Sequence, residues 1–188
     1  MKNAILTAFV ALLVMGGCGQ SDQRPDAQTR DSEAEVPIEQ LPDSLEPYGA
    51  RGALTRDNFT LGEMLTFAIQ DEHLAEAEYL DILQRHGNIK PFSNIVHSER
   101  QHIEALELLF DQYGMPVPPN EGAAHVIPTE TVQEALDACI AGEIDNIEMY
   151  RVFLEQEDVP EDVVQVLASL KSASEQHLDA FRRRLGNM

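Results

Sequence analysis

Five ionisable side chains stand where helical spacing predicts the apolar core: Glu72, Glu99, His102, Glu143 and His177. Glu99 and His102 are three residues apart in HSERQH, so on a helix they share one face. A buried carboxylate must be paired or must coordinate a metal ion, because burying it alone is costly. No Lys or Arg lies on these faces, and carboxylates with imidazoles suit iron or manganese. The pattern therefore predicts a metal site.

Four long helical segments carry these side chains. They run over about residues 61–85, 92–113, 131–156 and 161–185. Thr60 with Glu63, and Thr131 with Glu134, have the spacing of capping boxes at two of the starts. Each polar interruption falls near the middle of its segment, so an antiparallel bundle would bring all of them into one layer.

The connections between the segments differ in length. The first and third are short, which implies antiparallel neighbours, whereas the middle connection, GMPVPPNEGAAHVIPTE, is long and rich in proline. Two hairpins joined by a long crossover are typical of a ferritin-like four-helix bundle, whereas a simple up-and-down bundle has three short loops. No strand pattern competes, so the predicted fold over residues 59–188 is all-α.

The motif ERQH at residues 99–102 resembles the E-x-x-H motif of the ferritin-like di-iron carboxylate superfamily. The longer stretch DEHLAEAEYLDILQRHGNIKPFSNIVHSERQHIEALELLFDQYG is similar to a bacterial and archaeal ferritin-like family catalogued as a domain of unknown function. The similarity covers about residues 60–185. It implies a four-helix bundle with metal ions between the helices.

The resemblance also implies a role for each of the five side chains. Glu72 would be the terminal ligand of the first helix, Glu99 would bridge, and His102 would bind one metal ion. Glu143 would be the ligand from the third helix and His177 the imidazole from the fourth. Di-iron is the expected cofactor, with manganese or zinc as alternatives.

One position departs from the superfamily pattern. A second E-x-x-H would place a glutamate at position 174, where this sequence has Ser174. Glu175 is adjacent but rotated by about 100° around a helix, and Glu76 lies one turn after Glu72. Both are additional candidate ligands, and the departure leaves a mononuclear site open as an alternative.

Other polar residues of the helical segments have simpler interpretations. His73, His97 and His125 fall off the core faces or in the crossover, and we expect them to be solvated. Tyr79 and Tyr150 lie on core faces. Their hydroxyls need a partner there, so they either pack or hydrogen-bond to ligands or take part in electron transfer.

The N-terminal segment resembles a bacterial lipoprotein signal, with an apolar stretch at residues 4–15 that is too short to span a membrane. This implies that residues 1–17 are a signal peptide and that Cys18 is lipidated; a plain secretory signal is the alternative. Residues 18–58 are polar and are predicted to form a disordered acidic tether. Because Gly19, and no Asp, follows the cysteine, we expect the periplasmic face of the outer membrane in preference to the inner membrane.

The net charge of −20 excludes nucleic acid as a partner, because an acidic surface repels phosphates. The leading hypothesis is an envelope-anchored protein that oxidises Fe(II) with O2 or peroxide, as a ferroxidase or in protection against peroxide. A non-enzymatic metal carrier and a bundle with a degenerate site acting as an interaction module remain alternatives. Whether the protein is an enzyme stays open, no catalytic residue is assigned, and a homodimer is compatible with the pattern.

Overall fold

The computed structural model describes residues 44–188, and this part of the chain is all-α with no strand. Its helices are α1 (Ala50–Ala53), α2 (Leu61–His86), α3 (Phe92–Gln112), α4 (Gly122–His125), α5 (Val132–Leu154) and α6 (Glu161–Gly186). The four long helices confirm the predicted segments to within two residues at each end. The short helices α1 and α4 were not predicted.

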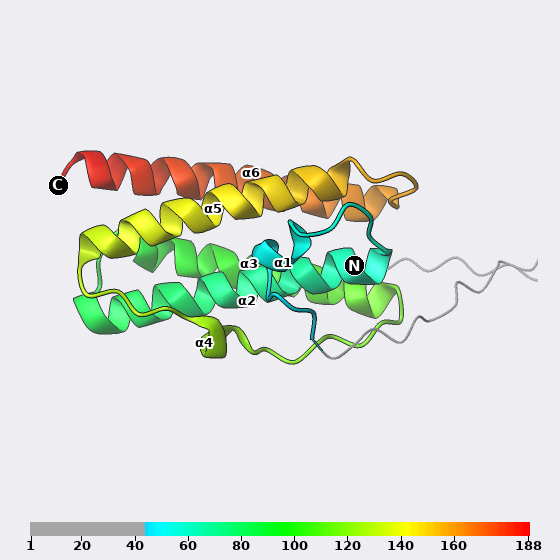
Figure 1. Ribbon diagram of the computed structural model, residues 1–188, viewed down its shortest axis with the longest axis horizontal. Coiled ribbons are helices and arrows are strands. Elements are labelled where there is room, and N and C mark those ends of the chain that lie inside the picture. Colours follow the sequence, from blue (N-terminus) through cyan, green and yellow to red (C-terminus); the bar gives the residue numbers. More distant parts are fainter. Residues whose placement is uncertain (1–43) are drawn as a thin grey trace, which may run out of the picture. The chain divides into compact units, whose positions relative to one another are not determined.

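The long helices form two antiparallel hairpins, α2 with α3 and α5 with α6 (Figure 1). Residues 113–131 form the crossover between the hairpins and run along the bundle beside α2. The short helix α4 of the crossover contacts α2. The predicted arrangement of two hairpins and one long connection is therefore confirmed.

Capping residues fix the starts of α2 and α5. At α2, the Thr60 hydroxyl accepts a hydrogen bond from the Glu63 N–H at 3.2 Å, and Glu63 accepts one from the Thr60 N–H at 2.9 Å. At α5, the Thr131 hydroxyl accepts from the Glu134 N–H at 3.1 Å. The Glu134 carboxylate reaches back to the Glu130 N–H instead of Thr131, so this second capping box forms only in part.

Residues 44–58 correct the predicted extent of the tether, because they pack against the bundle. The Gly49 N–H donates to Gln70 Oε1 at 3.3 Å, and the Gln70 amide donates to the Leu45 carbonyl at 3.2 Å. Four apolar residues of this segment are buried: Leu45, Tyr48, Ala50 and Ala53. The polar composition of the preceding residues hid this short apolar set, and the folded domain begins at or before residue 44.

The lipoprotein signal at residues 1–17, the lipidation site Cys18 and the tether up to residue 43 lie outside the described residues. Within residues 44–188, no helix combines the length and the apolar character that crossing a bilayer requires.

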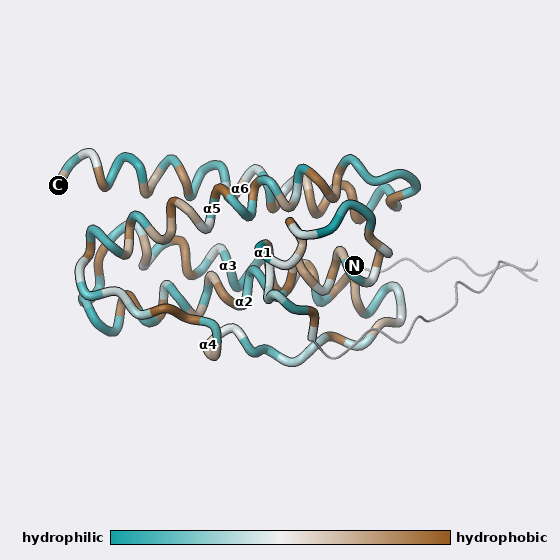
Figure 2. Tube along the Cα trace, viewed as in Figure 1, coloured by the Kyte–Doolittle hydropathy of each residue, from teal (hydrophilic) through white to brown (hydrophobic). Residues whose placement is uncertain are grey.

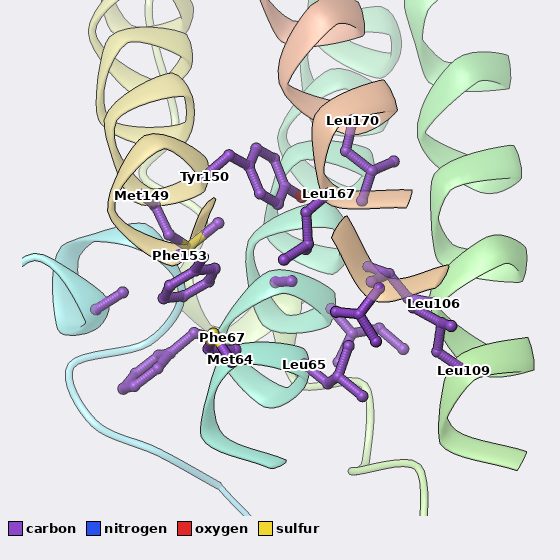
Figure 3. Close-up of a cluster of buried hydrophobic side chains, with 14 of the residues drawn as sticks. Met64, Leu65, Phe67, Leu106, Leu109, Met149, Tyr150, Phe153, Leu167 and Leu170 are labelled. Atoms are coloured by element: carbon purple, nitrogen blue, oxygen red, sulfur yellow. The ribbon is translucent and has the colours of Figure 1, made fainter. Parts of the chain in front are cut away.

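Two apolar clusters fill the bundle. One joins α1, α2, α3, α5 and α6 and includes Phe110. Figure 3 shows Phe67, Phe153, Leu65 and Leu167 of this cluster. The other lies further along the bundle and contains Tyr79, Phe92, Leu136 and Phe181. Figure 2 shows hydrophobic and hydrophilic positions alternating along all four long helices. In sequence, the polar residues of the predicted site fall between these two clusters on every helix.

Candidate metal centre

The five side chains predicted as ligands meet in the core, although they come from four helices. Each residue is at most 9% exposed. Glu72 is on α2, Glu99 and His102 on α3, Glu143 on α5 and His177 on α6. Their placement in one layer follows the prediction from the sequence, while their binding of metal stays a prediction.

The five residues form two groups that share Glu99. In the first, His102 Nδ1 lies 3.0 Å from Glu72 Oε2 and 2.9 Å from Glu99 Oε2. In the second, His177 Nδ1 lies 3.1 Å from Glu99 Oε1 and 3.4 Å from Glu143 Oε1. Each group offers one nitrogen and two oxygens within 4.8 Å of one another. Glu99 therefore presents a different oxygen to each histidine.

These spacings fit divalent cations. Ligand atoms held at about 2.1 Å from a tetrahedral or octahedral ion stand about 3.0–3.4 Å apart, and the N···O distances in both groups are 2.9–3.4 Å. Oxygen and imidazole donors suit iron, manganese and zinc. The residues of each group could therefore hold a metal ion, and Glu99 offers an oxygen to both groups.

Protons hold the centre together when no metal is bound. Burial lowers the pKa of His102, but hydrogen bonds and charge from Glu72 and Glu99 outweigh burial and raise it to about 10. In the same way, Glu143 and Glu99 raise the pKa of His177 to about 9. Burial raises the pKa of Glu72 to about 7. The pKa of Glu99 is lowered because its bonds to both histidines outweigh its burial.

Two tyrosines hydrogen-bond to the carboxylates of Glu72 and Glu143, the two glutamates that are not shared between the groups. The Tyr79 hydroxyl donates to Glu143 Oε1 at 2.8 Å, and the Tyr150 hydroxyl donates to Glu72 Oε1 at 2.6 Å. Two of the interpretations open for these tyrosines are confirmed: both side chains pack in the apolar clusters, and both hydroxyls donate to candidate ligands. Each bond joins α2 to α5, and each tyrosine follows the glutamate of its own helix by seven residues. The two hairpins thus contribute matching Glu and Tyr positions.

Ser174 lies where the pattern would place a second shared glutamate. It is 2% exposed, and its hydroxyl donates to Asn146 Oδ1 and to the Leu170 carbonyl, both at 3.1 Å. The Asn146 amide in turn donates to Asp71, which accepts a further bond from the Ala50 N–H at 2.8 Å. Position 174 therefore adds no fourth carboxylate to Glu72, Glu99 and Glu143, and its hydroxyl belongs instead to a hydrogen-bonded chain that runs through Asn146 to Asp71.

Sequence reasoning missed Asp71 and Asn146. Asn146 lies three residues after Glu143, on the same face of its helix, and this spacing was the available signal. Asp71 is adjacent to Glu72 and had no such signal. Burial raises the pKa of Asp71 well above its ordinary range.

Glu76 and Glu175, the additional candidates, do not reach the centre. Arg100 Nε donates to Glu76 Oε1 at 2.6 Å, and Lys171 Nζ donates to Glu175 Oε1 at 2.5 Å. The Glu175 side chain is 51% exposed. Helix α6 runs without a bulge in its hydrogen bonding through this region, so the side chain after Ser174 points outward.

The predicted solvation of three histidines is wrong for His73. His97 is exposed, and His125 is half-buried with its ring stacked on Tyr48 at 4.1 Å between centroids. His73 is 5% exposed because the crossover covers it: a Cβ atom built on Gly122 would lie 2.3 Å from the His73 carbonyl oxygen. The expectation failed because the crossover packs directly on α2.

A cavity of about 190 Å³ leads from the surface to the centre between α2 and α5. Its inner wall includes Glu99, Glu143 and Tyr79, and its outer wall includes His125 and Ile127 of the crossover. The cavity gives small molecules a route to one of the two groups of candidate ligands.

Residues 62–152 match the family described as "Uncharacterized protein domain (DUF2202)". The match contains four of the five residues of the centre and ends before His177. The chain is also 25% identical over 132 residues to the uncharacterized protein MJ0754 of Methanocaldococcus jannaschii, an alignment that covers 63% of this chain and 71% of the relative. No solved structure matches the chain. The comparisons therefore relate this chain to uncharacterized proteins, and the case for its chemistry comes from the centre itself.

Proposed function

We propose that this protein binds two metal ions in the core of its bundle, and that the ions are iron. One observation carries the proposal: two sets of one imidazole nitrogen and two carboxylate oxygens share Glu99. Bound iron would supply redox chemistry, so that Fe(II) is oxidised by O2 or peroxide. The physiological role would be that of a ferroxidase or of protection against peroxide.

The side chains of this chain would prepare the centre for that role. Glu99 would hold both ions through its two oxygens, and Glu72 with His102, and Glu143 with His177, would complete the two sets. Tyr79 and Tyr150 orient the carboxylates of the two unshared glutamates through hydrogen bonds of 2.8 and 2.6 Å. The two apolar clusters limit the access of water, which strengthens charge interactions in the core.

A second candidate function is metal binding without turnover. Ser174 and Asn146 leave the centre with three carboxylates, which offset one charge fewer than two divalent ions carry. A carrier or storage role would follow if metal binds but neither O2 nor peroxide is consumed.

Metal content tests the proposal. The folded domain, purified without chelator and incubated with Fe(II) without oxygen, is expected to hold about two irons per chain. A Glu99→Ala/His102→Ala variant should lose them. The exposed pair His97→Ala/Glu104→Ala on the same helix is the matched control and should retain them.

The outcomes separate the candidate functions. Oxidation of the bound Fe(II) with consumption of O2 or peroxide would support the oxidase, whereas bound iron without turnover would support the carrier. Absence of metal from a correctly folded protein would overturn both and leave the interaction module.

We further propose that Cys18 anchors the protein to the periplasmic face of the outer membrane. The support is the sequence pattern of residues 1–18 alone. Expression of the full chain and of a Cys18→Ser variant, followed by membrane fractionation, tests it. Equal distribution of the two proteins between membrane and soluble fractions would contradict lipidation.

A further inference from the structure

The cavity between α2 and α5 is larger than the reactants of the proposed function require. Its volume is about 190 Å³, whereas one water molecule takes up about 30 Å³ in the liquid, and an apolar protein cavity of about 150 Å³ can bind benzene. O2 or peroxide alone would leave most of this space unfilled. The volume suits an organic molecule of roughly the size of a substituted benzene.

Small and apolar side chains form much of the wall. Ala75 on α2 and Ala138 and Gly142 on α5 line the cavity, with Leu74 and Cys139 beside them. Gly142 is exposed, and a Cβ atom built on it would meet nothing within 4 Å, so the cavity opens to solvent at this point of α5. The apolar wall favours a ligand with an apolar body.

Polar groups are placed at particular points of this wall. The hydroxyl of Thr129 is buried and has no hydrogen-bond partner among the described residues. The Glu78 and Glu143 carboxylates also line the cavity and can accept hydrogen bonds. An O–H or N–H group on a ligand would therefore have carboxyl acceptors within the cavity.

The charges around the cavity disfavour anions. Five acidic side chains line it, Asp71, Glu78, Glu99, Glu143 and Asp145, against the one guanidinium of Arg51. An organic anion of the same size would lose its hydration and would meet several carboxyl groups but only one guanidinium. Neutral molecules avoid that cost.

We propose that this cavity binds a small neutral organic molecule of about the size of phenol, with an apolar body and an O–H or N–H donor. The ligand would lie beside Glu143, at the open side of the candidate centre. Binding is a property of the fold. Its role as the molecule on which the centre acts, for example as the reductant, rests on the proposed function.

Phenol is the probe for the test, and benzoate is the anionic control of similar shape. The full chain, treated with chelator and separately loaded with metal, is titrated with each compound by calorimetry or by protein NMR. Phenol should bind with a dissociation constant on the order of 1 mM, and benzoate should bind at least about tenfold more weakly. NMR shifts should fall on residues of the cavity.

Two glycines provide a matched pair of variants. Gly142→Leu adds a side chain at the exposed rim of the cavity, whereas Gly186→Leu adds one at the end of α6, away from the cavity, and neither added Cβ has a neighbour within 4 Å. Leucine favours helix over glycine, so both variants should fold. Gly142→Leu should weaken phenol binding at least about tenfold. Ala138→Leu, at the position one helical turn before Gly142, should have the same effect.

The proposal would be overturned if phenol does not bind, or if it binds all the variants with equal affinity. Benzoate binding as tightly as phenol would overturn the proposed ligand class. Phenol binding to the chelator-treated protein does not depend on metal. Loss of metal binding therefore contradicts the proposed function, and loss of phenol binding contradicts the proposed ligand site.

Discussion

At the scale of residues, Glu99 differs from the other carboxylates of the centre because both histidines face it. His102 Nδ1 lies 2.9 Å from one of its oxygens and His177 Nδ1 lies 3.1 Å from the other. Glu72 and Glu143 each face one histidine. Substitutions at these glutamates should therefore differ in how many ions are lost.

We predict that Glu99→Gln abolishes the binding of both metal ions, whereas Glu143→Gln abolishes one. The amide keeps the shape of the side chain but removes the charge that a divalent ion requires. The number of metal ions bound per chain is measured for both variants by metal analysis after anaerobic loading. Equal losses in the two variants would contradict the shared role of Glu99.

Metal affinity should rise with pH. The pKa values of His102 and His177 are raised to about 10 and about 9, so both imidazoles carry a proton that an ion must displace at neutral pH. Each displaced proton makes affinity rise about tenfold per pH unit below these pKa values. Competition titrations with Mn(II) between pH 6.5 and 8.5 measure how steeply the metal affinity changes with pH. Affinity that is independent of pH would show that the metal does not replace these protons.

At the scale of elements, the segment around α1 depends on two glycines. Gly49 has a positive φ of 67°, and a Cβ atom there would lie 2.7 Å from Asp71 Oδ1. A Cβ atom on Gly52 would lie 1.7 Å from the Pro47 carbonyl oxygen and 2.8 Å from the Phe67 ring. The segment therefore docks on α2 through close approach of its backbone.

We predict that Gly52→Ala lowers the free energy of unfolding by about 1–3 kcal/mol, because the added methyl would clash with the Pro47 carbonyl oxygen inside the segment and with the Phe67 ring of α2. Gly186→Ala is the control: its Cβ atom meets nothing, and it should be neutral or slightly stabilising. Urea denaturation measures the difference, and limited proteolysis reports whether residues 44–58 become accessible. Equal stability of the two variants would show that the docked segment is unimportant.

Local signals explain which elements could be predicted from the sequence. The long helices have apolar residues at helical spacing and caps such as Thr60, and these patterns depend only on neighbours in the chain. The position of the candidate centre could be predicted because Glu72, Glu99 and Glu143 interrupt apolar faces at matching depths. Four-residue helices such as α1 and α4 have too few residues for a periodic pattern.

Tertiary contacts explain what could not be predicted. His73 is buried because the crossover covers it, and Glu76 pairs with Arg100 of another helix. The chain from Asp71 through Asn146 to Ser174 joins α2, α5 and α6, so no single segment reveals it. Each of these features depends on how the helices are rotated against one another.

At the scale of the whole molecule, the charged centre lies between two apolar clusters in a strongly acidic chain. Its stability without metal should depend on pH through His102, Glu72 and His177, whose pKa is raised to about 9. The folded pKa of His102, about 10, exceeds its ordinary value of 6.5, so its contribution is full below pH 6.5 and is lost as pH rises through 10. The pKa of Glu72 is also raised, to about 7, so its contribution is lost as pH rises from 4.5 through 7.

We therefore predict that the chelator-treated protein melts several degrees lower at pH 9.5 than at pH 6.5. The metal-loaded protein should show a smaller change, because the ions take the place of the protons. Differential scanning calorimetry on both forms measures this. A metal-free protein that is more stable at pH 9.5 would contradict the protonated centre.

The matching positions of the two hairpins have a consequence for the history of the molecule. Each hairpin has Glu, then Tyr seven residues later, on its first helix, and His on its second. Duplication of one ancestral hairpin would leave this pattern, with Glu99 and Ser174 as descendants of one position. Under such a duplication the two copies would have diverged at this position, where one has a glutamate and the other a serine whose hydroxyl donates to Asn146. Ser174→Glu with Asn146→Ala would be a reversion, and relatives with a glutamate at the first position should lack asparagine at the second.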